Sequence, residues 1–228
     1  MGRELEKEFA NDEEVVGLLN DLINKGTDKY KYADTMYNLG KAFGKILLPK
    51  ISGYPNINLA STVEDADYLA KGVIDVLEQK GQKVFLTVFW NNNFKPNEEN
   101  GIAIAPIIKE FNQKNDAPVN LLIIVKSIIS SSCVVRTNLT RLIEKSTPDH
   151  IFVVAPVLLK GAIGSLKSEF DNEISQKFEY LYFAVDDERT EDGLVQPGIG
   201  GNIYNRLGFS NQMAKNRYIP DIVKQRRY

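Results

Sequence analysis

The residues whose types and spacing best suit chemistry lie in one segment near the carboxyl end of the chain. Residues 185–209 read VDDERTEDGLVQPGIGGNIYNRLGF, so three acids and an arginine follow an apolar run and a glycine-rich stretch comes next. Because glycine has no side chain, its backbone N–H and C=O groups can approach a planar ligand and hydrogen-bond to its edge. Glycine and proline also supply ordinary turn geometry. The segment therefore predicts either a ligand-binding loop or a turn-rich hairpin.

A second polar segment reads KSIISSSC over residues 126–133, between an apolar run at 119–125 and a helical pattern at 134–145. Three successive serine hydroxyls at a helix start suit an anion, which the helix dipole also favours. The same serines suit a polar turn that caps the helix, and the sequence leaves both interpretations open. Cys133 is either a thiol activated by the helix start or a small buried core residue.

Composition excludes several other kinds of site. One cysteine and one histidine exclude an intramolecular disulfide framework, a multi-cysteine metal site and a His-cluster zinc site. A formal net charge of −2 excludes nucleic-acid binding through overall charge. The charge is uneven, however: residues 1–28 hold eight acids and three bases, and residues 206–228 hold six bases and one acid. Either the acidic and basic ends attract each other, or the basic residues within 213–228 bind a nucleic acid or an acidic partner.

The hydrophobic pattern changes near residue 80. Before it, apolar residues recur at helical spacing, with a turn-rich stretch at 49–60 and a capping box formed by Ser61 and Glu64. After it, apolar runs typical of strands buried on both faces alternate with helical patterns. The runs lie at 83–90, 119–125, 150–156 and 180–185, and helices are predicted near 102–114, 134–145 and 157–170.

This alternation predicts the α/β fold class, with an open, mostly parallel sheet flanked by helices and a helical N-terminal region. We expect a helical part at 1–80, an α/β core at 81–209 and a basic tail at 210–228. Ligands in such sheets bind where loops leave the carboxyl ends of the strands, and both polar segments occupy such loops. No apolar run is long enough to span a bilayer and no secretory leader is evident, so we expect a cytoplasmic protein without a membrane partner.

Residues 187–208 resemble the C-terminal signature of the uracil phosphoribosyltransferase family. The matching residues are Asp187-Glu188-Arg189, then Gly193, then Pro197-Gly198-Ile199-Gly200, and finally Arg206 with Gly208. In that family an acidic DER leaves a strand, a flap follows, and a PGLGD or PGIGN segment recognises the pyrimidine edge through backbone groups. The resemblance implies the type I phosphoribosyltransferase fold and base binding by Asp187, Glu188, Arg189, Pro197, Gly198, Ile199, Gly200 and Arg206.

The reaction that the resemblance implies is of the glycosyltransferase class: uracil and phosphoribosyl pyrophosphate (PRPP), with magnesium, give uridine monophosphate and pyrophosphate. In the family, a glycine-rich loop after the strand equivalent to 119–125 cradles the 5-phosphate, and an acid there contacts ribose hydroxyls. The aligned residues, which the resemblance assigns to phosphate or PRPP, are Lys126, Ser127, Ser130, Ser131, Ser132 and Cys133. Lysine thus replaces the acid, and Ser132-Cys133 replace a Gly-Gly pair that eases backbone approach to phosphate.

Two further differences from the family lie in segments that the family uses to bind PRPP. Lys95 is the one obvious cation at 88–101, where the family has an Arg-Ala-Gly loop, and Gly201 and Asn205 stand where the family has acids. The sequence therefore predicts a divergent phosphoribosyltransferase-like protein that binds a nucleobase, a nucleotide or PRPP. Transfer is either retained, with Mg²⁺, or lost in a catalytically inactive nucleotide-sensing or assembly subunit. A nucleic-acid-associated module is the third alternative, and we expect a homo-oligomer or a protein partner.

Overall fold

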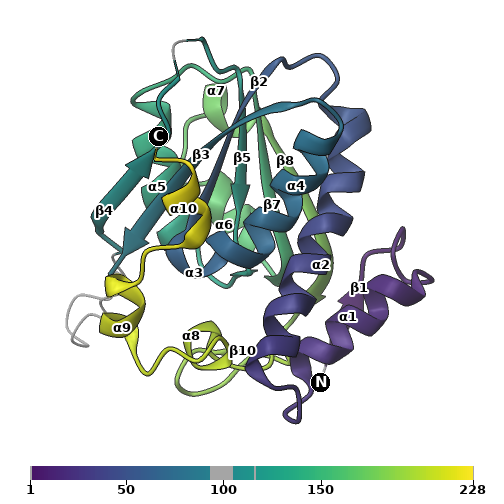
Figure 1. Cartoon of the computed structure of the whole chain (residues 1–228). Coiled ribbons are helices and arrows are strands. Elements are labelled where there is room, and N and C mark those ends of the chain that lie inside the picture. Colours follow the sequence, from purple (N-terminus) through teal and green to yellow (C-terminus); the bar gives the residue numbers. More distant parts are fainter. Residues whose placement is uncertain (1, 93–104, 116, 228) are drawn as a thin grey trace, which may run out of the picture.

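The computed structural model of the chain describes residues 2–92, 105–115 and 117–227, which form a main sheet with helices on both faces and a separate two-stranded sheet, β9 (Glu188–Arg189) with β10 (Val195–Gln196), as Figure 1 shows for the main sheet. The strand order is β1-β8-β7-β5-β2-β3-β4, and β6 pairs with β7. The five central strands, β8, β7, β5, β2 and β3, are parallel to one another. The edge strands β1 and β4 pair antiparallel with β8 and β3. The bounds are β1 Arg3–Leu5, β2 Asn56–Thr62, β3 Lys83–Asn91, β4 Ile107–Asn112, β5 Leu121–Val125, β6 Ile128–Ile129, β7 His150–Leu159 and β8 Phe178–Asp186.

Two apolar layers hold the helices to the sheet. On one face, α1, α2 and α4 pack against the sheet with Leu39, Phe43 and Ile74 fully buried. On the other face, α5 and α6 pack through Leu139 and Leu166. The helices are α1 Glu13–Ile23, α2 Lys29–Leu47, α3 Val63–Asp65, α4 Lys71–Gln79, α5 Cys133–Ile143, α6 Ala162–Lys167, α7 Asn172–Ser175, α8 Ile203–Arg206, α9 Gln212–Arg217 and α10 Asp221–Gln225. None of these described helices is long and apolar enough to cross a membrane.

The predicted fold class is confirmed: an open, mostly parallel α/β sheet flanked by helices. The four apolar runs form β3, β5, β7 and β8. Strands β3, β5 and β7 are buried along most of their length because helices cover both faces of the sheet, whereas β8 has half-buried residues between its buried ones.

The prediction of a turn-rich stretch at 49–60 was wrong over its second half, which forms the central strand β2. Its neighbours are β3 and β5, so the burial of Ile57 and Leu59 depends on residues far along the chain. The predicted capping box is also absent: Thr62 is the N-cap of α3, without a side-chain cap hydrogen bond. The first 80 residues therefore supply an edge strand and a central strand as well as helices.

The helix predicted near 102–114 is a strand where the structure describes it. Residues 107–112 form β4, which pairs antiparallel with β3 through Thr87 opposite Asn112. Pairing with a strand already in the sheet overrides local helical preference. Residues 102–104 lie outside the described part of the chain.

Helices α2 and α4 cross at two glycines. A Cβ atom added to Gly40 would lie 2.1 Å from the Leu69 carbonyl oxygen, and one added to Gly72 would lie 2.1 Å from the Tyr37 carbonyl oxygen. Gly40→Ala is expected to lower the free energy of unfolding by about 2 kcal/mol, since overpacking outweighs the better helix propensity of alanine. Urea denaturation measures this change.

Gly17 provides a matched control in helix α1. A Cβ atom there would meet nothing within 4 Å. Gly17→Ala is therefore expected to raise the free energy of unfolding by about 0.5 to 1 kcal/mol. Equal effects of the two substitutions would contradict the close helix crossing.

Candidate functional site

The topology of the sheet marks the place where a ligand would bind. From β2 the chain moves to β3 and β4 on one side, and it then returns to β5 and continues to β7 and β8 on the other. Neighbouring strands β2 and β5 therefore form the switch point of the sheet. In open α/β folds, ligands bind outside the carboxyl ends of the strands at this point.

Four charged side chains meet at this switch point, and we call Glu64, Asp65, Lys126 and Lys215 the charge cluster. Lys126 follows β5, and its Nζ lies 2.7 Å from Asp65 Oδ2 and 3.3 Å from Glu64 Oε1, both just after β2. Lys215 Nζ, from α9, lies 3.6 Å from Glu64 Oε2. All four residues are buried. Two acids and two bases thus offset one another where a ligand would be expected.

Burial and ion pairing act in opposite directions on the pKa values of the cluster. Burial by itself lowers the pKa of Lys126, but attraction to Asp65 and Glu64 outweighs burial, so this pKa is raised. Burial likewise raises the pKa of Glu64, yet Lys126 and Lys215 together hold it below its ordinary value. The pKa of Lys215 is lowered, because burial there outweighs attraction to Glu64. The Lys126 and Glu64 charges therefore stabilise each other.

The C-terminal segment covers this edge of the sheet from the side of β3, where Figure 1 draws α9 and α10 in yellow. Lys215 Nζ donates to the Asn91 carbonyl at 2.9 Å, and Trp90 Nε1 donates to the Tyr218 carbonyl at 2.9 Å. The Asp67 carboxylate accepts from the Tyr218 hydroxyl and from two backbone N–H groups at the start of α10. These contacts attach the tail to the strand ends.

A cavity of about 10 Å³ lies between β2, β5 and α5, and Thr62, Lys126 and Asn138 are among the residues that line it. That volume is about the size needed to hold one water molecule. This cavity is therefore too small for a nucleotide.

The residues predicted to bind phosphate divide into two groups. Lys126 and Ser127 lie in or beside the charge cluster, with Lys126 Nζ donating to Ser127 Oγ at 3.2 Å. The strand β6 separates them from Ser130, Ser131, Ser132 and Cys133 at the start of α5. Two residues of the second group are hydrogen-bonded within the chain. The Ser132 hydroxyl donates to Glu169 Oε1 at 2.8 Å, and Arg189 donates to the Ser130 carbonyl. Ser131 is exposed.

Cys133 is the first residue of α5 and is buried. Burial raises the pKa of its thiol, and the nearby Arg136 only partly offsets this effect. The thiol is therefore not activated by its position at the helix start, and the alternative of a buried core residue fits the structure.

The predicted base-binding loop is held by the N-terminal part of the chain. The Asp186 carboxylate accepts from the Gly198 N–H at 2.7 Å and from Arg3 Nε and Nη2, both at 2.8 Å. Arg3 Nη2 also donates to the Gly198 carbonyl at 2.5 Å, and the Tyr32 hydroxyl donates to the Ile199 carbonyl at 3.0 Å. Backbone groups predicted to recognise a base edge are thus hydrogen-bonded within the chain.

The other predicted base-binding residues lie around this loop. Asp187, Glu188 and Arg189 are exposed, with Glu188–Arg189 forming β9, which pairs with β10, Val195–Gln196. Pro197 follows a cis peptide bond, and Gly200 packs so that an added Cβ would lie 2.0 Å from the Leu22 carbonyl oxygen. Arg206 lies 4.6 Å over the Tyr32 ring and donates to the Leu22 and Asn24 carbonyls. The structure therefore brings residues 197–206 together around α1 and α2.

The sequence analysis did not identify the partners of Lys126 in the charge cluster or the partners of the predicted base-binding loop. Glu64 and Asp65 are adjacent acids directly after a strand, which is a signal of a site once β2 is recognised as a strand. Asp186 was noticed as part of the acidic run, but its pairing with Arg3 has no local signature. Lys95 and residues 93–101 of the predicted pyrophosphate loop lie outside the described residues.

No protein-family model and no curated protein matches the sequence. Among solved structures, the chain is similar to the AQ2163 protein from Aquifex aeolicus, with a TM-score of 0.65 and 16% identity over 86% of this chain and 95% of that one. It also matches a hypoxanthine phosphoribosyltransferase from Staphylococcus aureus (TM-score 0.44, 13% identity, 68% of this chain and 74% of that one). An adenine phosphoribosyltransferase from Leishmania donovani matches with a TM-score of 0.45 and 14% identity over 68% of each chain. At these identities, the similarity to the Aquifex protein shows that the two chains share a fold.

Proposed function

We propose that this chain is a phosphoribosyltransferase-like protein that binds a nucleobase or nucleotide and does not transfer the phosphoribosyl group. The observation that carries the proposal is the Lys126 ammonium, 2.7 Å from the Asp65 carboxylate directly after β5. The resemblance expects an acid at this position, where it would accept hydrogen bonds from ribose hydroxyls. A lysine ammonium has three donors and no acceptor, so it cannot take that role.

The charge cluster also does not fit a magnesium ion. Mg²⁺ binds carboxylate oxygens and water in near-octahedral geometry. The carboxylates nearest the switch point, Glu64 and Asp65, each face a lysine ammonium, which repels a divalent cation. Among the described residues, no group of three or more His, Cys, Asp or Glu side chains could hold a metal ion. Binding without transfer is the function that this arrangement favours, as in a nucleotide-sensing or assembly subunit.

The start of α5 is where we propose that the phosphate of the ligand binds. Ser131 is exposed and Ser132 is half-buried, and α5 is an eleven-residue helix whose N-cap makes no side-chain cap hydrogen bond. Backbone N–H groups at a helix start attract anions. The base-binding role of residues 187–189, 197–200 and 206 stays a prediction. The nucleic-acid alternative has less support, because Lys215, Lys224 and Arg226 pair with acids of the same chain.

Incubation with labelled PRPP, Mg²⁺ and uracil, hypoxanthine or adenine is expected to give no labelled nucleotide above the level without protein. Calorimetric titration with uracil, uridine monophosphate and adenosine monophosphate is expected to give saturable binding of at least one of them. Ser131→Ala should weaken nucleotide binding and leave the fold intact, since this side chain is exposed. Robust turnover would overturn the loss of transfer, and failure of every base and nucleotide to bind would overturn the binding role.

A further inference from the structure

Strand β8 has one side without a partner over the first part of its length. The short strand β1 pairs only with residues 184–186 of β8, and one more hydrogen bond joins the Glu6 N–H to the Phe183 carbonyl at 2.9 Å. Among the described residues, no strand pairs with residues 178–182 on the side away from β7. The backbone of this segment can therefore pair with another strand.

The pairing of β8 with β7 shows which backbone groups point outward. The Ile151 N–H donates to the Lys177 carbonyl at 2.9 Å, so residues 177, 179 and 181 direct their backbone groups toward β7. Neighbouring residues of a strand direct these groups to opposite sides. The N–H and C=O groups of Phe178, Tyr180 and Tyr182 therefore point away from the sheet.

The sequence of this segment does little to protect the edge. Edge strands are often blocked by proline or by charged side chains, especially lysine. Residues 178–182 read FEYLY, with no proline and no lysine. The one charged residue, Glu179, is paired within the chain, since Lys50 Nζ lies 2.8 Å from its Oε1. Tyr180, Leu181 and Tyr182 are only half-buried. The edge is thus open and largely aromatic.

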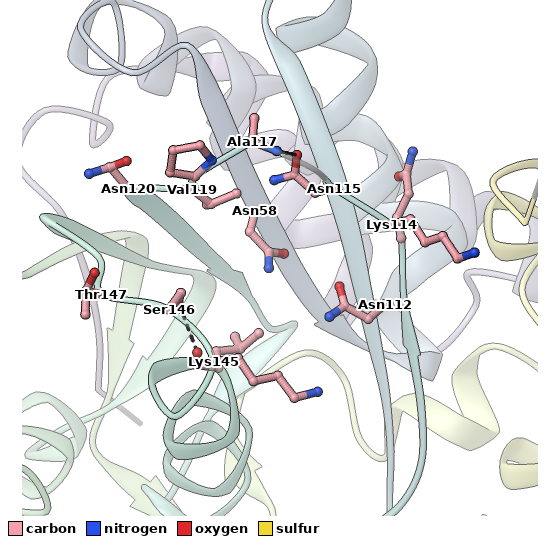
Figure 2. Close-up of a pocket in the computed structure, with 13 residues that line it drawn as sticks. Asn58, Asn112, Lys114, Asn115, Ala117, Val119, Asn120, Lys145, Ser146 and Thr147 are labelled. Carbon is pink, nitrogen blue, oxygen red and sulfur yellow. Dashed lines mark hydrogen bonds between the residues drawn. The ribbon is translucent and has the colours of Figure 1, made fainter.

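A groove of about 280 Å³ lies beside this edge, on the face of the sheet that α2 covers. Glu6, Glu8 and Phe9 line the end near β1, and Ile46 and Lys50 line the other end. By contrast, the cavity of about 500 Å³ in Figure 2 lies at the beginnings of β2 and β5, and each of these strands has a neighbour on both sides. The smaller groove is therefore the one that borders an unpaired strand.

The outward groups of β8 match those of a second β8 that runs antiparallel to it. With Tyr180 opposite Tyr180 of the partner subunit, Phe178 of each copy lies opposite Tyr182 of the partner subunit. Every outward N–H and C=O group of residues 178–182 then meets an acceptor or a donor. The opposed pairs are all aromatic, and aromatic cross-strand pairs stabilise antiparallel strands. A two-fold axis relates the copies, as in the commonest homo-oligomers.

The charges at the two ends of the groove fit this arrangement. The charged residues at the β1 end are Glu6, Lys7 and Glu8, and those at the opposite end are Lys50, Lys177 and Glu179. One end is therefore net acidic and the other net basic. The acids of α7 do not change this balance, because that helix packs on the other face of the sheet through Ile174.

Antiparallel pairing places the acidic end of each copy against the basic end of the other, whereas parallel pairing would bring like charges together. We infer that β8 of this chain pairs antiparallel with β8 of a second copy and joins the two sheets into one. The interface is centred on Tyr180 and includes the groove.

Sedimentation velocity of the full chain over a range of micromolar concentrations is expected to show a species of twice the mass of the chain. Tyr180→Pro removes the outward N–H at the centre of the interface and leaves the hydrogen bonds to β7, which neighbouring residues make. Tyr180→Ala removes the same ring and keeps the N–H. We expect Tyr180→Pro to raise the dimer dissociation constant at least about tenfold more than Tyr180→Ala does. Urea denaturation confirms that both variants fold.

Charge reversal tests the antiparallel direction. Lys50→Glu and Glu8→Lys are each expected to raise the dissociation constant about tenfold, since each brings like charges together at two symmetric places. A mixture of these two variants is expected to recover the dimer, because opposite charges meet again in the mixed species. Lys80→Glu, at an exposed lysine outside the groove, should leave the dimer unchanged.

Three results would overturn the inference. The first is an unmodified chain that stays monomeric at every concentration. The second is a dimer that Tyr180→Pro weakens no more than Tyr180→Ala, which would place the interface elsewhere. The third is a mixture of Lys50→Glu and Glu8→Lys that dimerises no better than either variant alone, which would exclude the antiparallel contact between the two ends of the groove.

Discussion

Lys126→Met is expected to lower the free energy of unfolding by about 3 to 5 kcal/mol, because it leaves the buried Asp65 carboxylate without its cation and Glu64 with Lys215 alone. Asp65 is fully buried and Glu64 nearly so, and Lys126 Nζ lies within 3.3 Å of both. Methionine has a similar length and flexibility, so the change removes charge with little change in volume. Urea denaturation at neutral pH measures the loss.

Lys31→Met is the matched control for this prediction. Lys31 Nζ also lies 2.7 Å from an aspartate, Asp21 Oδ1, but its side chain is 55% exposed. The same substitution there is expected to cost less than about 1 kcal/mol, since exposed ion pairs contribute little. A loss at Lys126 as small as the loss at Lys31 would mean that water reaches the charge cluster. In that case Glu64 and Asp65 would be available to a ligand or metal ion, and the argument against PRPP chemistry would weaken.

Local patterns were sufficient for the buried strands and insufficient for strands with polar residues. The runs that form β5 and β7 are continuous in apolar residues, so no partner needs to be known to recognise them. In contrast, β2 reads NINLAST after a turn-rich stretch, and only β3 and β5 on either side make it a central strand. Residues of β4 were assigned to a helix for the same reason, because pairing with β3 decides their conformation.

The same division between local and distant information applies to the site. The sequence shows that Lys126 follows a buried strand. It also shows that a lysine stands where the family resemblance expects an acid. Its partners Glu64 and Asp65 are more than sixty residues away, and Lys215 approaches from the opposite end of the chain. A loop rich in glycine was correctly located at 197–200, yet the groups that occupy its backbone come from Arg3 and Tyr32. Side-chain partners of this kind follow from the folded topology, which local patterns in a single sequence do not reveal.

The charge cluster and the loop at 197–200 share one structural feature. In both places, groups that resemble ligand-binding groups are hydrogen-bonded to residues of the same chain. Buried polar groups are costly when unpaired, so each internal partner stabilises the fold in the absence of a ligand. A ligand would need to replace these partners, and its apparent affinity would fall by the free energy of breaking them.

Asp186→Asn is expected to lower the free energy of unfolding by about 3 kcal/mol and to loosen the loop at 197–200. The fully buried carboxylate accepts from two nitrogens of Arg3 and from the Gly198 N–H. An asparagine keeps one acceptor oxygen and places an NH₂ group against donors, so at least one of these hydrogen bonds becomes a donor–donor contact. Urea denaturation measures the stability, and hydrogen exchange at the Gly198 amide measures the loosening of the loop.

Asp12→Asn is the control, because Asp12 caps α1 by accepting from the Val15 N–H, and asparagine caps a helix as well as aspartate does. That variant should unfold at nearly the same urea concentration as the unmodified chain. Exchange at Gly198 that speeds up in Asp186→Asn by more than exchange in the sheet strand β5, which reflects only the loss of global stability, would locate the effect in the loop. If Asp186→Asn kept full stability and slow exchange at Gly198, Arg3 and Asp186 would not hold the loop, and its backbone groups would again be available to a base edge.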